Sequence, residues 1–205
     1  MKRFLQTLLF LCITILSSNG QNFDFHPSST ADGTAHKVIK FRDIPISGNI
    51  SDMVTKLQNL GYTFDGMKDG VAVLNGTFLN ESCEIVLYAT PISKQMHTIT
   101  VSSGSKSSWY SLKSEYTKIK DLIKEKYNVN PNNSSEKFYS PYYEGDGYEM
   151  QALRNDKCSY FSTFKIGDDK IGVYILGDKV LLLYENSSNK SLNKREENRK
   201  AYLDI

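Results

Sequence analysis

The sequence contains two blocks of strand-forming residues, and each block follows one amphipathic segment. In CEIVLYAT, residues 83–90, the residues Cys83, Ile85 and Leu87 alternate with a second set. A period of two places successive side chains on opposite faces of a β-strand, so one face of this strand is predicted to lie in a core. The turn sequences GDD and GD between later segments favour antiparallel pairing. The other predicted strands are KVIKF, TFDGMKDGVAVLNGTF, HTITVSS, YEMQALR, CSYFSTFKI, KIGVYIL and KVLLLYE.

One helix is predicted ahead of each block. The first has Ser51 as its N-cap and ends at Gly61, a residue type that is favoured just past a helix C-terminus. The second begins after SSGSKSS. In both, apolar residues recur three and four positions apart, which gives a helix one apolar face. These residues are Ile50, Met53, Val54, Leu57 and Leu60 in the first helix, and Trp109, Leu112, Tyr116, Ile119, Leu122 and Ile123 in the second.

The order of these segments predicts the fold class. Helix, strands, helix and strands indicate an α+β fold of two tandem helix-plus-antiparallel-strand repeats, which form one sheet with helices on one face. The repeats are expected over about residues 37–104 and 105–190, within a single domain at 37–190, and residues 191–205 are expected to form a C-terminal helical tail. The second face of the sheet is then open to solvent or to a partner.

The N-terminus predicts export. Lys2 and Arg3 precede an apolar stretch and then a small, polar run that ends at Gly20, which is the order of a secretory signal peptide. A transmembrane helix needs about 20 apolar residues, more than this stretch supplies, and no second apolar run follows. Residues 1–20 are therefore predicted to be a signal peptide and 21–36 a flexible lead. The protein is expected in the periplasm or secreted, without a transmembrane segment after cleavage; an uncleaved anchor is the alternative.

Charge excludes one class of partner. The chain has 25 basic and 23 acidic residues, and its first twenty residues hold two of the basic ones, Lys2 and Arg3, and no acid. The chain without its signal peptide is therefore formally neutral. Nucleic acid binding needs a clustered excess of Lys and Arg, so no nucleic-acid partner is predicted.

Two cysteines, Cys83 and Cys158, remain after the signal peptide is removed. An even number in an oxidising compartment permits a disulfide, and closing a loop of this length would stabilise the fold by about 4 kcal/mol. The alternative is two free thiols that pack as small hydrophobic groups. The sequence leaves both possibilities open.

Familiar catalytic and metal-binding patterns are absent from the sequence. A Ser or Cys nucleophile needs a nearby base, and the three histidines are His26, His36 and His97. The first two lie in the predicted lead, and His97 is expected to be a semi-buried residue of a strand. There is no H-E-x-x-H and no C-x-x-C, so neither a metal site nor a cofactor is predicted. The acidic segment EGDGYE, 144–149, lacks the spacing of a calcium-binding loop and is interpreted as a turn.

The segment KFYSPYYEGDGYEM, residues 137–150, is the most suggestive for binding. Its tyrosines Tyr139, Tyr142, Tyr143 and Tyr148 surround a proline and several acids. Exposed tyrosines offer flat, amphipathic contact area at low entropic cost, which suits a protein, peptide or glycan partner. The alternative is that these rings pack beneath a long loop.

Several short motifs occur between about residue 38 and the end of the chain. They are F-x-x-I-P-I-x-G at 41–48, L-x-x-x-G-aromatic at 57–62, DKCSYFSTF, and an ending that begins LLLYEN. In these motifs the chain resembles small exported proteins of the Bacteroidetes that have no assigned activity. The resemblance implies a fold similar to that of β-lactamase-inhibitory protein, a tandem helix-plus-sheet repeat. It implies no functional residue, because the motif positions are turn and core residues.

Together these features favour an exported, non-catalytic binding or interaction module that uses its open sheet face or its tyrosine-rich loop. The expected partner is a protein, peptide or glycan of the cell envelope. The alternative is an envelope hydrolase of unrecognised type, with acids such as Glu144 or Glu149 in general acid–base roles. A structural or assembly factor is a third hypothesis.

Overall fold

A computed structural model describes residues 38–203 of the chain. The predicted signal peptide and lead, residues 1–36, lie outside the described residues. The fold is α+β, with one large antiparallel sheet and four helices in the described part. Its elements are β1 (Lys40–Phe41), β2 (Ile44–Pro45), α2 (Ile50–Asn59), β3 (Thr63–Lys68), β4 (Val71–Phe78), β5 (Glu81–Ala89), β6 (Met96–Ser103), α3 (Trp109–Tyr127), β7 (Asn133–Phe138), α4 (Glu149–Arg154), β8 (Cys158–Ile166), β9 (Asp169–Leu176), β10 (Lys179–Glu185) and α5 (Ser187–Leu203).

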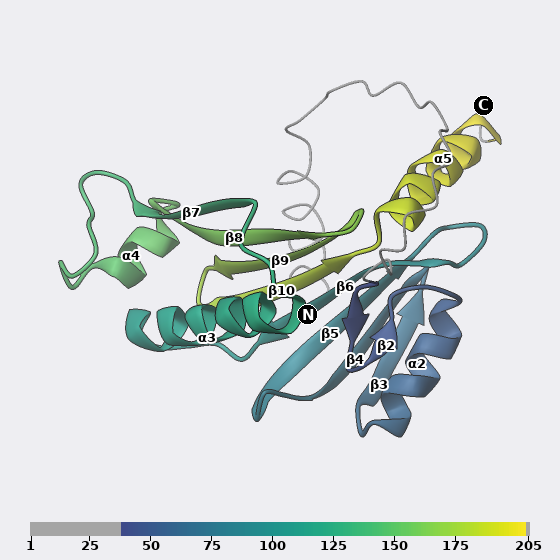
Figure 1. The fold of residues 1–205 in the computed structure, drawn as a ribbon, viewed down its shortest axis with the longest axis horizontal. Coiled ribbons are helices and arrows are strands. Elements are labelled where there is room, and N and C mark those ends of the chain that lie inside the picture. The colour runs from purple at the N-terminus through teal and green to yellow at the C-terminus, as the bar shows by residue number, and fades with distance from the viewer. Residues whose placement is uncertain (1–37, 204–205) are drawn as a thin grey trace. The chain divides into compact units, whose positions relative to one another are not determined.

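The large sheet has eight strands in the order β3-β4-β5-β6-β10-β9-β8-β7 (Figure 1). Strands β3 to β6 form one antiparallel run and β7 to β10 form the other. The two runs meet at the centre, where β6 pairs antiparallel with β10 and Val101 lies opposite Leu182. Strands β3 and β7, which begin the two runs, therefore form the two edges of the sheet.

Helix α2 has the predicted apolar face except at Leu60, which is exposed and follows the helix, and it has a different N-cap. The side chain of Asn49, rather than Ser51, caps the helix by accepting a hydrogen bond from the Ser51 backbone N–H at 2.9 Å. The cap lies two residues earlier than predicted because Asn49 is extended and Ser51 is already helical. Gly61 follows the helix with a φ of +89°, as expected for the residue past a C-terminus. The buried residues of the helix are Ile50, Met53, Val54 and Leu57.

Helix α3 begins at Trp109, after Ser108 caps it by accepting from the Ser111 backbone N–H at 3.2 Å. The helix ends at Asn128, whose left-handed φ of +49° suits an asparagine. Leu122, predicted to lie on the apolar face, is exposed. The buried residues are instead Trp109, Leu112, Tyr116, Ile119, Ile123 and Tyr127.

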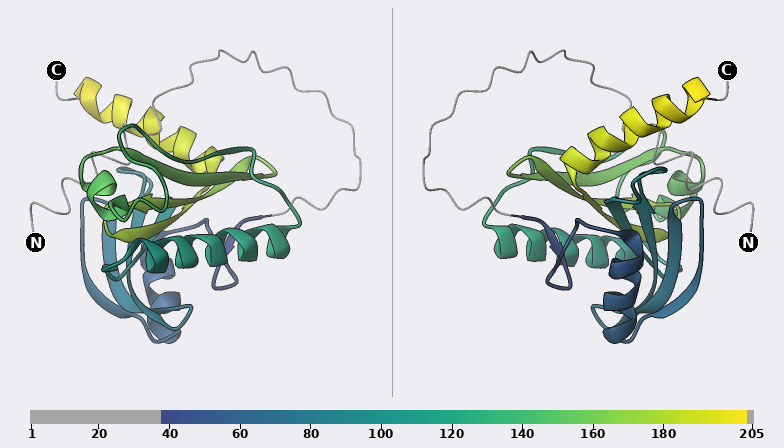
Figure 2. Two further views of the ribbon diagram at one scale, coloured as in Figure 1. Left: turned by 90° about the vertical axis from the view of Figure 1, so that its left-hand side faces the viewer. Right: turned by 90° about the vertical axis from the view of Figure 1, so that its right-hand side faces the viewer.

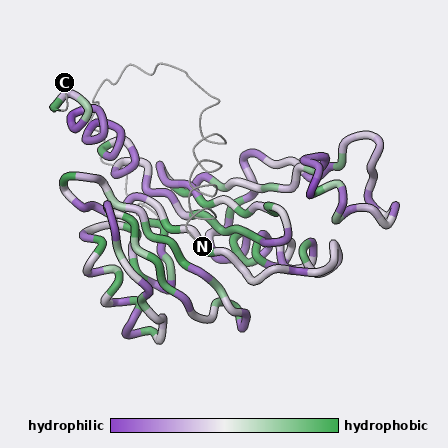
Figure 3. The backbone as a smooth tube through the Cα atoms, turned by 180° about the vertical axis from the view of Figure 1, so that it is seen from behind, coloured by the Kyte–Doolittle hydropathy of each residue, from purple (hydrophilic) through white to green (hydrophobic). Residues whose placement is uncertain are grey.

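Helices α2 and α3 share one apolar core with one face of the sheet. That core contains Leu57 of α2, Tyr116 of α3 and Leu87 of β5, all of them buried. Helix α5 differs, because its buried residues are the polar pair Asn193 and Glu196, and Figure 3 shows it as mainly hydrophilic.

Helix α5 contacts β6 and β9, and it lies on the other side of the sheet from α3 (Figure 2). The expectation of helices on one face therefore holds for α2 and α3 but not for α5. None of the helices in residues 38–203 is long and apolar enough to cross a membrane.

The secondary structure differs from the prediction at several segments. YEMQALR, predicted as a strand, contains helix α4, because Glu, Met, Gln, Ala, Leu and Arg all favour helix. The polar segment NSSEKF, where no strand was predicted, is β7. An edge strand needs little apolar sequence, so its period is hard to detect. Helix α5 starts at Ser187, four residues before the predicted tail.

The two described cysteines are free thiols, so the disulfide between Cys83 and Cys158 does not form. The strands that carry them, β5 and β8, are separated by β6, β10 and β9. Four strand spacings amount to about 19 Å, whereas a disulfide requires Cα atoms within about 7 Å. Cys83 is buried in the core, and burial raises the pKa of both thiols, that of Cys158 to about 12. The alternative of two thiols packed as small hydrophobic groups is therefore the correct one.

Candidate functional site

A long connection joins β7 to β8, and it contains all four predicted binding tyrosines. It comprises residues 139–157, includes helix α4 and extends beyond the strands it connects (Figure 1); we call it the tyrosine excursion. By contrast, two residues, Asp69 and Gly70, join β3 to β4 at the opposite edge. Connecting segments carry binding and catalytic residues more often than the elements they join, because a rigid scaffold positions them. The tyrosine excursion is therefore the first candidate for a site.

The tyrosine excursion is anchored to the body of the protein by Glu144. Its Oε1 accepts a hydrogen bond from Trp109 Nε1 at 3.1 Å, and its Oε2 accepts one from the Tyr160 hydroxyl at 2.9 Å. Lys113 of α3 forms an ion pair with the same carboxylate. The hydrogen bond from Lys113 holds the pKa of Glu144 below its usual value. Glu144 is therefore an ionised anchor and is not poised to donate a proton.

A cluster of aromatic rings lies beneath this anchor. The Trp109 ring packs edge-on against Phe138 and Tyr160, with ring centroids 5.0 Å and 4.7 Å away. Tyr160 also packs against Tyr116, at 5.9 Å. Edge-to-face aromatic pairs contribute beyond the area they bury. The rings therefore fix the point at which the tyrosine excursion leaves the sheet.

Carboxylates also hold the tip of the tyrosine excursion through its own backbone. Asp146 accepts hydrogen bonds from the backbone N–H groups of Tyr143, at 3.0 Å, and Tyr148, at 2.7 Å. Glu149 accepts from the Gly145 N–H at 2.7 Å. The acids of EGDGYE thus hold a turn together, as the sequence predicts for this segment. Within residues 38–203, no group of three or more His, Cys, Asp or Glu residues could hold a metal ion.

The predicted binding tyrosines are differently exposed. Tyr143 and Tyr148 are 66% and 61% exposed, and Tyr139 is 41% exposed. Tyr142 is half-buried, and its hydroxyl accepts a hydrogen bond from Asn155 Nδ2 at 2.9 Å. Three of the four rings are thus available to a partner, whereas Tyr142 helps to hold the tyrosine excursion together.

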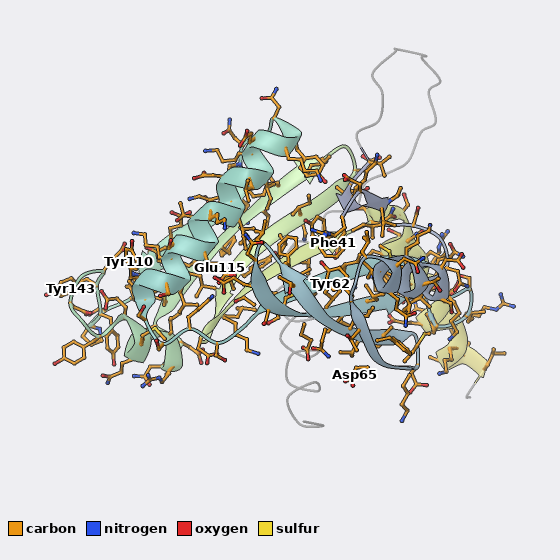
Figure 4. The ribbon with its side chains drawn as sticks, turned by 90° about the horizontal axis from the view of Figure 1, so that it is seen from below. Phe41, Tyr62, Asp65, Tyr110, Glu115 and Tyr143 are labelled. Carbon is orange, nitrogen blue, oxygen red and sulfur yellow. The ribbon has the colours of Figure 1, made fainter. Side chains whose placement is uncertain are left out.

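Sequence reasoning missed a fifth tyrosine, Tyr110. It is 82% exposed on the first turn of α3 and lies at the same end of the molecule as Tyr143 (Figure 4). Its neighbour Trp109 bonds to Glu144, so the first turn of α3 abuts the tyrosine excursion. The signal was present in the sequence, because Tyr110 falls outside the apolar stripe of that helix. We call Tyr110, Tyr139, Tyr143 and Tyr148 the tyrosine surface.

The structure gives His97 a structural role. The ring is buried, its Nδ1 lies 2.8 Å from Thr98 Oγ1, and it stacks on Tyr88 with centroids 6.4 Å apart. Burial lowers the pKa of His97 to about 3, with a smaller contribution from Lys190. The imidazole is therefore neutral at physiological pH and lies away from the tyrosine excursion.

A second polar cluster combines residue types that occur in proton-transfer sites. The Tyr116 hydroxyl donates to Glu136 Oε1 at 2.9 Å and accepts from Ser162 Oγ at 2.7 Å, and Lys120 Nζ bonds to the same Glu136 oxygen at 2.6 Å. Ser162 is fully buried, however, and burial raises the pKa of Tyr116. A tyrosine with a raised pKa stays protonated at physiological pH and does not exchange its proton readily, so the role of this cluster is to tie α3 to β7 and β8.

A third cluster pairs acids at a crevice beside α3. Lys106 forms an ion pair with Glu81 and lies 3.3 Å from Glu115 Oε2. Burial raises the pKa of Glu115. The adjoining cavity, which Cys83 also lines, has a volume of about 10 Å³, whereas ligand pockets measure about 300–1,000 Å³. The acids therefore have no room for a substrate.

Comparisons of the chain with protein-family models, with curated proteins and with solved structures find no match. The function is therefore argued from the geometry of the tyrosine surface and of the elements that hold it.

Proposed function

We propose that this protein is an exported, non-catalytic interaction module that binds a macromolecular partner of the cell envelope through the tyrosine surface. The observation that carries this proposal is the display of exposed rings on a connection that is fixed at its base and at its tip. Tyr143 and Tyr148 are mostly exposed, yet the backbone N–H of each is bonded to Asp146. Export rests on the signal peptide predicted from residues 1–20.

Binding favours such an arrangement for a physical reason. A tyrosine side chain has two main torsions and a large amphipathic ring, so it loses little entropy when a partner immobilises it. A mobile loop must also be ordered on binding, which lowers affinity. Here Glu144 and Asp146 already order the backbone. The tyrosine excursion therefore loses its conformational entropy when the protein folds, and it has little more to lose when a partner binds.

We also propose that the two halves of the sheet are tandem repeats. Helix α2 precedes β3 to β6, and helix α3 precedes β7 to β10. The last strands of the two runs, β6 and β10, pair at the centre. In this scheme the tyrosine excursion is an insertion into the second repeat, at the place where the first has a two-residue turn. A shared fold would serve as the scaffold and the insertion as the binding element.

The contacts of the two acids speak against the hydrolase alternative. Glu144 is held by Trp109, Lys113 and Tyr160, and Glu149 is bonded to a backbone N–H. General acid–base catalysis needs one carboxyl group that gains and loses a proton near the operating pH. An ionised anchor and a turn-stabilising carboxylate do not supply it.

Partner capture from envelope extract tests the proposal. The chain from residue 21 onward is immobilised, and the captured material is measured by quantitative mass spectrometry. The variant Tyr143→Ala/Tyr148→Ala is expected to reduce capture of the main partner at least tenfold. Tyr202→Ala is the matched control, because Tyr202 is also highly exposed but lies on α5. Equal capture by the double variant and the parent chain would reject the tyrosine surface.

A further inference from the structure

The two edge strands of the sheet differ in how they are protected. Edge strands expose unpaired backbone groups, and proteins commonly shield them with bulges, prolines or charges. In β3 the register with β4 shifts between Phe64 and Gly66, which marks a bulge. In β7 six consecutive residues, Asn133–Phe138, pair with β8 without a shift and none is a proline, so its protection is limited to the charges of Glu136 and Lys137. Strand β7 is thus the regular edge of the sheet.

The pairing of β7 determines which backbone groups point outward. The Tyr139 N–H continues the ladder by donating to Lys157 O at 2.9 Å. Inward and outward directions alternate along an antiparallel strand. The backbone groups of Ser135 and Lys137 therefore face β8, and those of Ser134 and Glu136 face away from the sheet. The outer edge of β7 consequently offers a row of donors and acceptors that fits one further strand.

This edge is continuous with the tyrosine surface. Tyr139 is the first residue after β7, and the ammonium group of Lys137 lies 5.1 Å from the centre of its ring. A chain paired along β7 would thus reach Tyr139 as it leaves the strand. The edge and the tyrosine surface can contact one partner together.

The charges beside this edge favour an acidic partner. On the sheet face opposite α3, β7 and β8 carry two lysines and no acid, whereas β9 and β10, farther from the edge, carry two more lysines and Glu185, which lies 3.8 Å from Lys170. A basic face beside an edge attracts an acidic strand and repels a basic one. The lysines are Lys137, Lys165, Lys170 and Lys179.

We propose that β7 binds an extended, acidic polypeptide segment, which adds to the sheet as a further strand and places an acidic side chain beside Lys137. This inference rests on the proposed function, since it identifies the partner of the tyrosine surface as a polypeptide. The main-chain hydrogen bonds supply affinity, and the lysines select acidic segments.

The test uses a fluorescent ten-residue peptide in which glutamate alternates with valine and threonine. Binding to the chain from residue 21 onward is measured by anisotropy at low salt. The peptide is expected to bind at least tenfold more tightly than a version with lysine in place of glutamate. It is also expected to bind at least tenfold more tightly than a version N-methylated on the edge that would face β7. If the N-methylated peptide binds as tightly as the unmodified peptide, strand addition is wrong. This result does not depend on any substitution in the protein.

A matched pair of variants tests the same edge from the protein side. Ser134→Pro removes an outward N–H and leaves the ladder with β8 intact, whereas Ser134→Ala keeps the N–H and removes only the hydroxyl. The proline variant is expected to weaken binding of the acidic peptide at least tenfold and the alanine variant less than twofold. Equal affinities in the two variants would overturn the proposal. A β7-dependent dimer in size-exclusion chromatography would show that the occupant is a second copy instead.

Partner capture by the two variants distinguishes a failure of strand addition from a failure of the proposed function. If Tyr143→Ala/Tyr148→Ala abolishes capture of the envelope partner while Ser134→Pro leaves it unchanged, strand addition is wrong and the proposed function stands. If capture survives the tyrosine substitutions but is lost in Ser134→Pro, the edge is a site and the tyrosine surface is not.

Discussion

The connections at the two edges of the sheet both reverse the chain between antiparallel strands, but they differ in length and in contacts. Strands β3 and β4 are joined by Asp69 and Gly70, both with positive φ, which is the tight turn that an antiparallel pair requires. Strands β7 and β8 are joined by residues 139–157, which return to the body through Glu144. The first connection only joins β3 to β4. The second presents a surface, and it is held by hydrogen bonds and aromatic rings.

The difference shows where extra chain can be tolerated in such a fold. A connection at an edge strand can lengthen without disturbing the pairing of the inner strands. It remains ordered only if its base has something to pack against. Here the ring of Trp109 and the carboxylate of Glu144 provide that base. Two pairs of substitutions and one change of pH test whether the two halves of the sheet are stabilised in these different ways.

Removal of the Trp109 ring should have the largest effect. Trp109→Ala deletes a buried ring that contacts Phe138 and Tyr160, and the loss of a large buried aromatic side chain typically costs about 3–5 kcal/mol. Trp109→Phe keeps a ring and loses the bond to Glu144, so it should cost less. Urea unfolding followed by circular dichroism measures both, because Trp109 is the sole tryptophan and fluorescence would be lost. Equal stability of the two variants would show that the ring does not support the tyrosine excursion.

Mild acid should lower the free energy of unfolding through His97, which lies on β6 in the half of the sheet that lacks the tyrosine excursion. The pKa of His97 is about 3 in the folded protein, against 6.5 for a free histidine. The unfolded chain therefore binds this proton first, and the stabilising contribution of neutral His97 is lost as the pH falls from about 6.5 toward 3. By pH 4.5 the free energy of unfolding should fall by about 2–3 kcal/mol.

The variant His97→Gln isolates this effect, because glutamine can still bond to Thr98 and does not titrate. Urea unfolding of both proteins at pH 7 and pH 4.5 gives the comparison. The parent chain should lose more stability than the variant over this interval. Identical losses would contradict a buried, neutral imidazole. Glu144 should contribute little over this range, because its pKa lies below the usual value and its stabilising effect is lost only as the pH falls through that lower pKa.

Alanine substitution of one glycine in each connection should have the smallest effect on stability. Gly70 and Gly147 both have a φ of +79°, but a Cβ at Gly70 would lie 3.0 Å from Ala89 O, whereas a Cβ at Gly147 would meet nothing within 4 Å. A left-handed non-glycine residue costs about 1–2 kcal/mol. Gly147→Ala should show that cost alone, and Gly70→Ala should show a larger one. Thermal unfolding ranks them, and the reverse order would contradict the close approach at the tight turn.

The core of the fold could be predicted from residue spacing because its residues repeat with the period of their element. Ile50, Met53, Val54 and Leu57 form one stripe of α2 and are all buried. Cys83, Ile85 and Leu87 of β5 share a buried face. Burial of apolar surface favours these periods whatever the neighbouring elements are. The resemblance to β-lactamase-inhibitory protein stays a prediction.

The failures have physical reasons as well. β7 has no apolar alternation, because Glu136 bonds to the polar groups of Tyr116 and Lys120 and only Phe138 packs against the core. YEMQALR is helical although the prediction is a strand, because a segment of this length does not distinguish the two periods and its residues from Glu149 to Arg154 all favour helix. The position of Tyr110 outside the apolar stripe of α3 indicates exposure, but its nearness to the tyrosine excursion depends on the contact of Trp109 with Glu144, which the sequence does not show.

Local period and residue type were enough to predict the two helical stripes, the alternating strands and the cluster of four tyrosine rings. Only the tertiary structure decided which of those rings face solvent, that Tyr110 joins them, and that Cys83 and Cys158 lie too far apart to bond. Those outcomes depend on strand order and on contacts such as Glu144 with Trp109, between residues far apart in the chain, which no local pattern encodes.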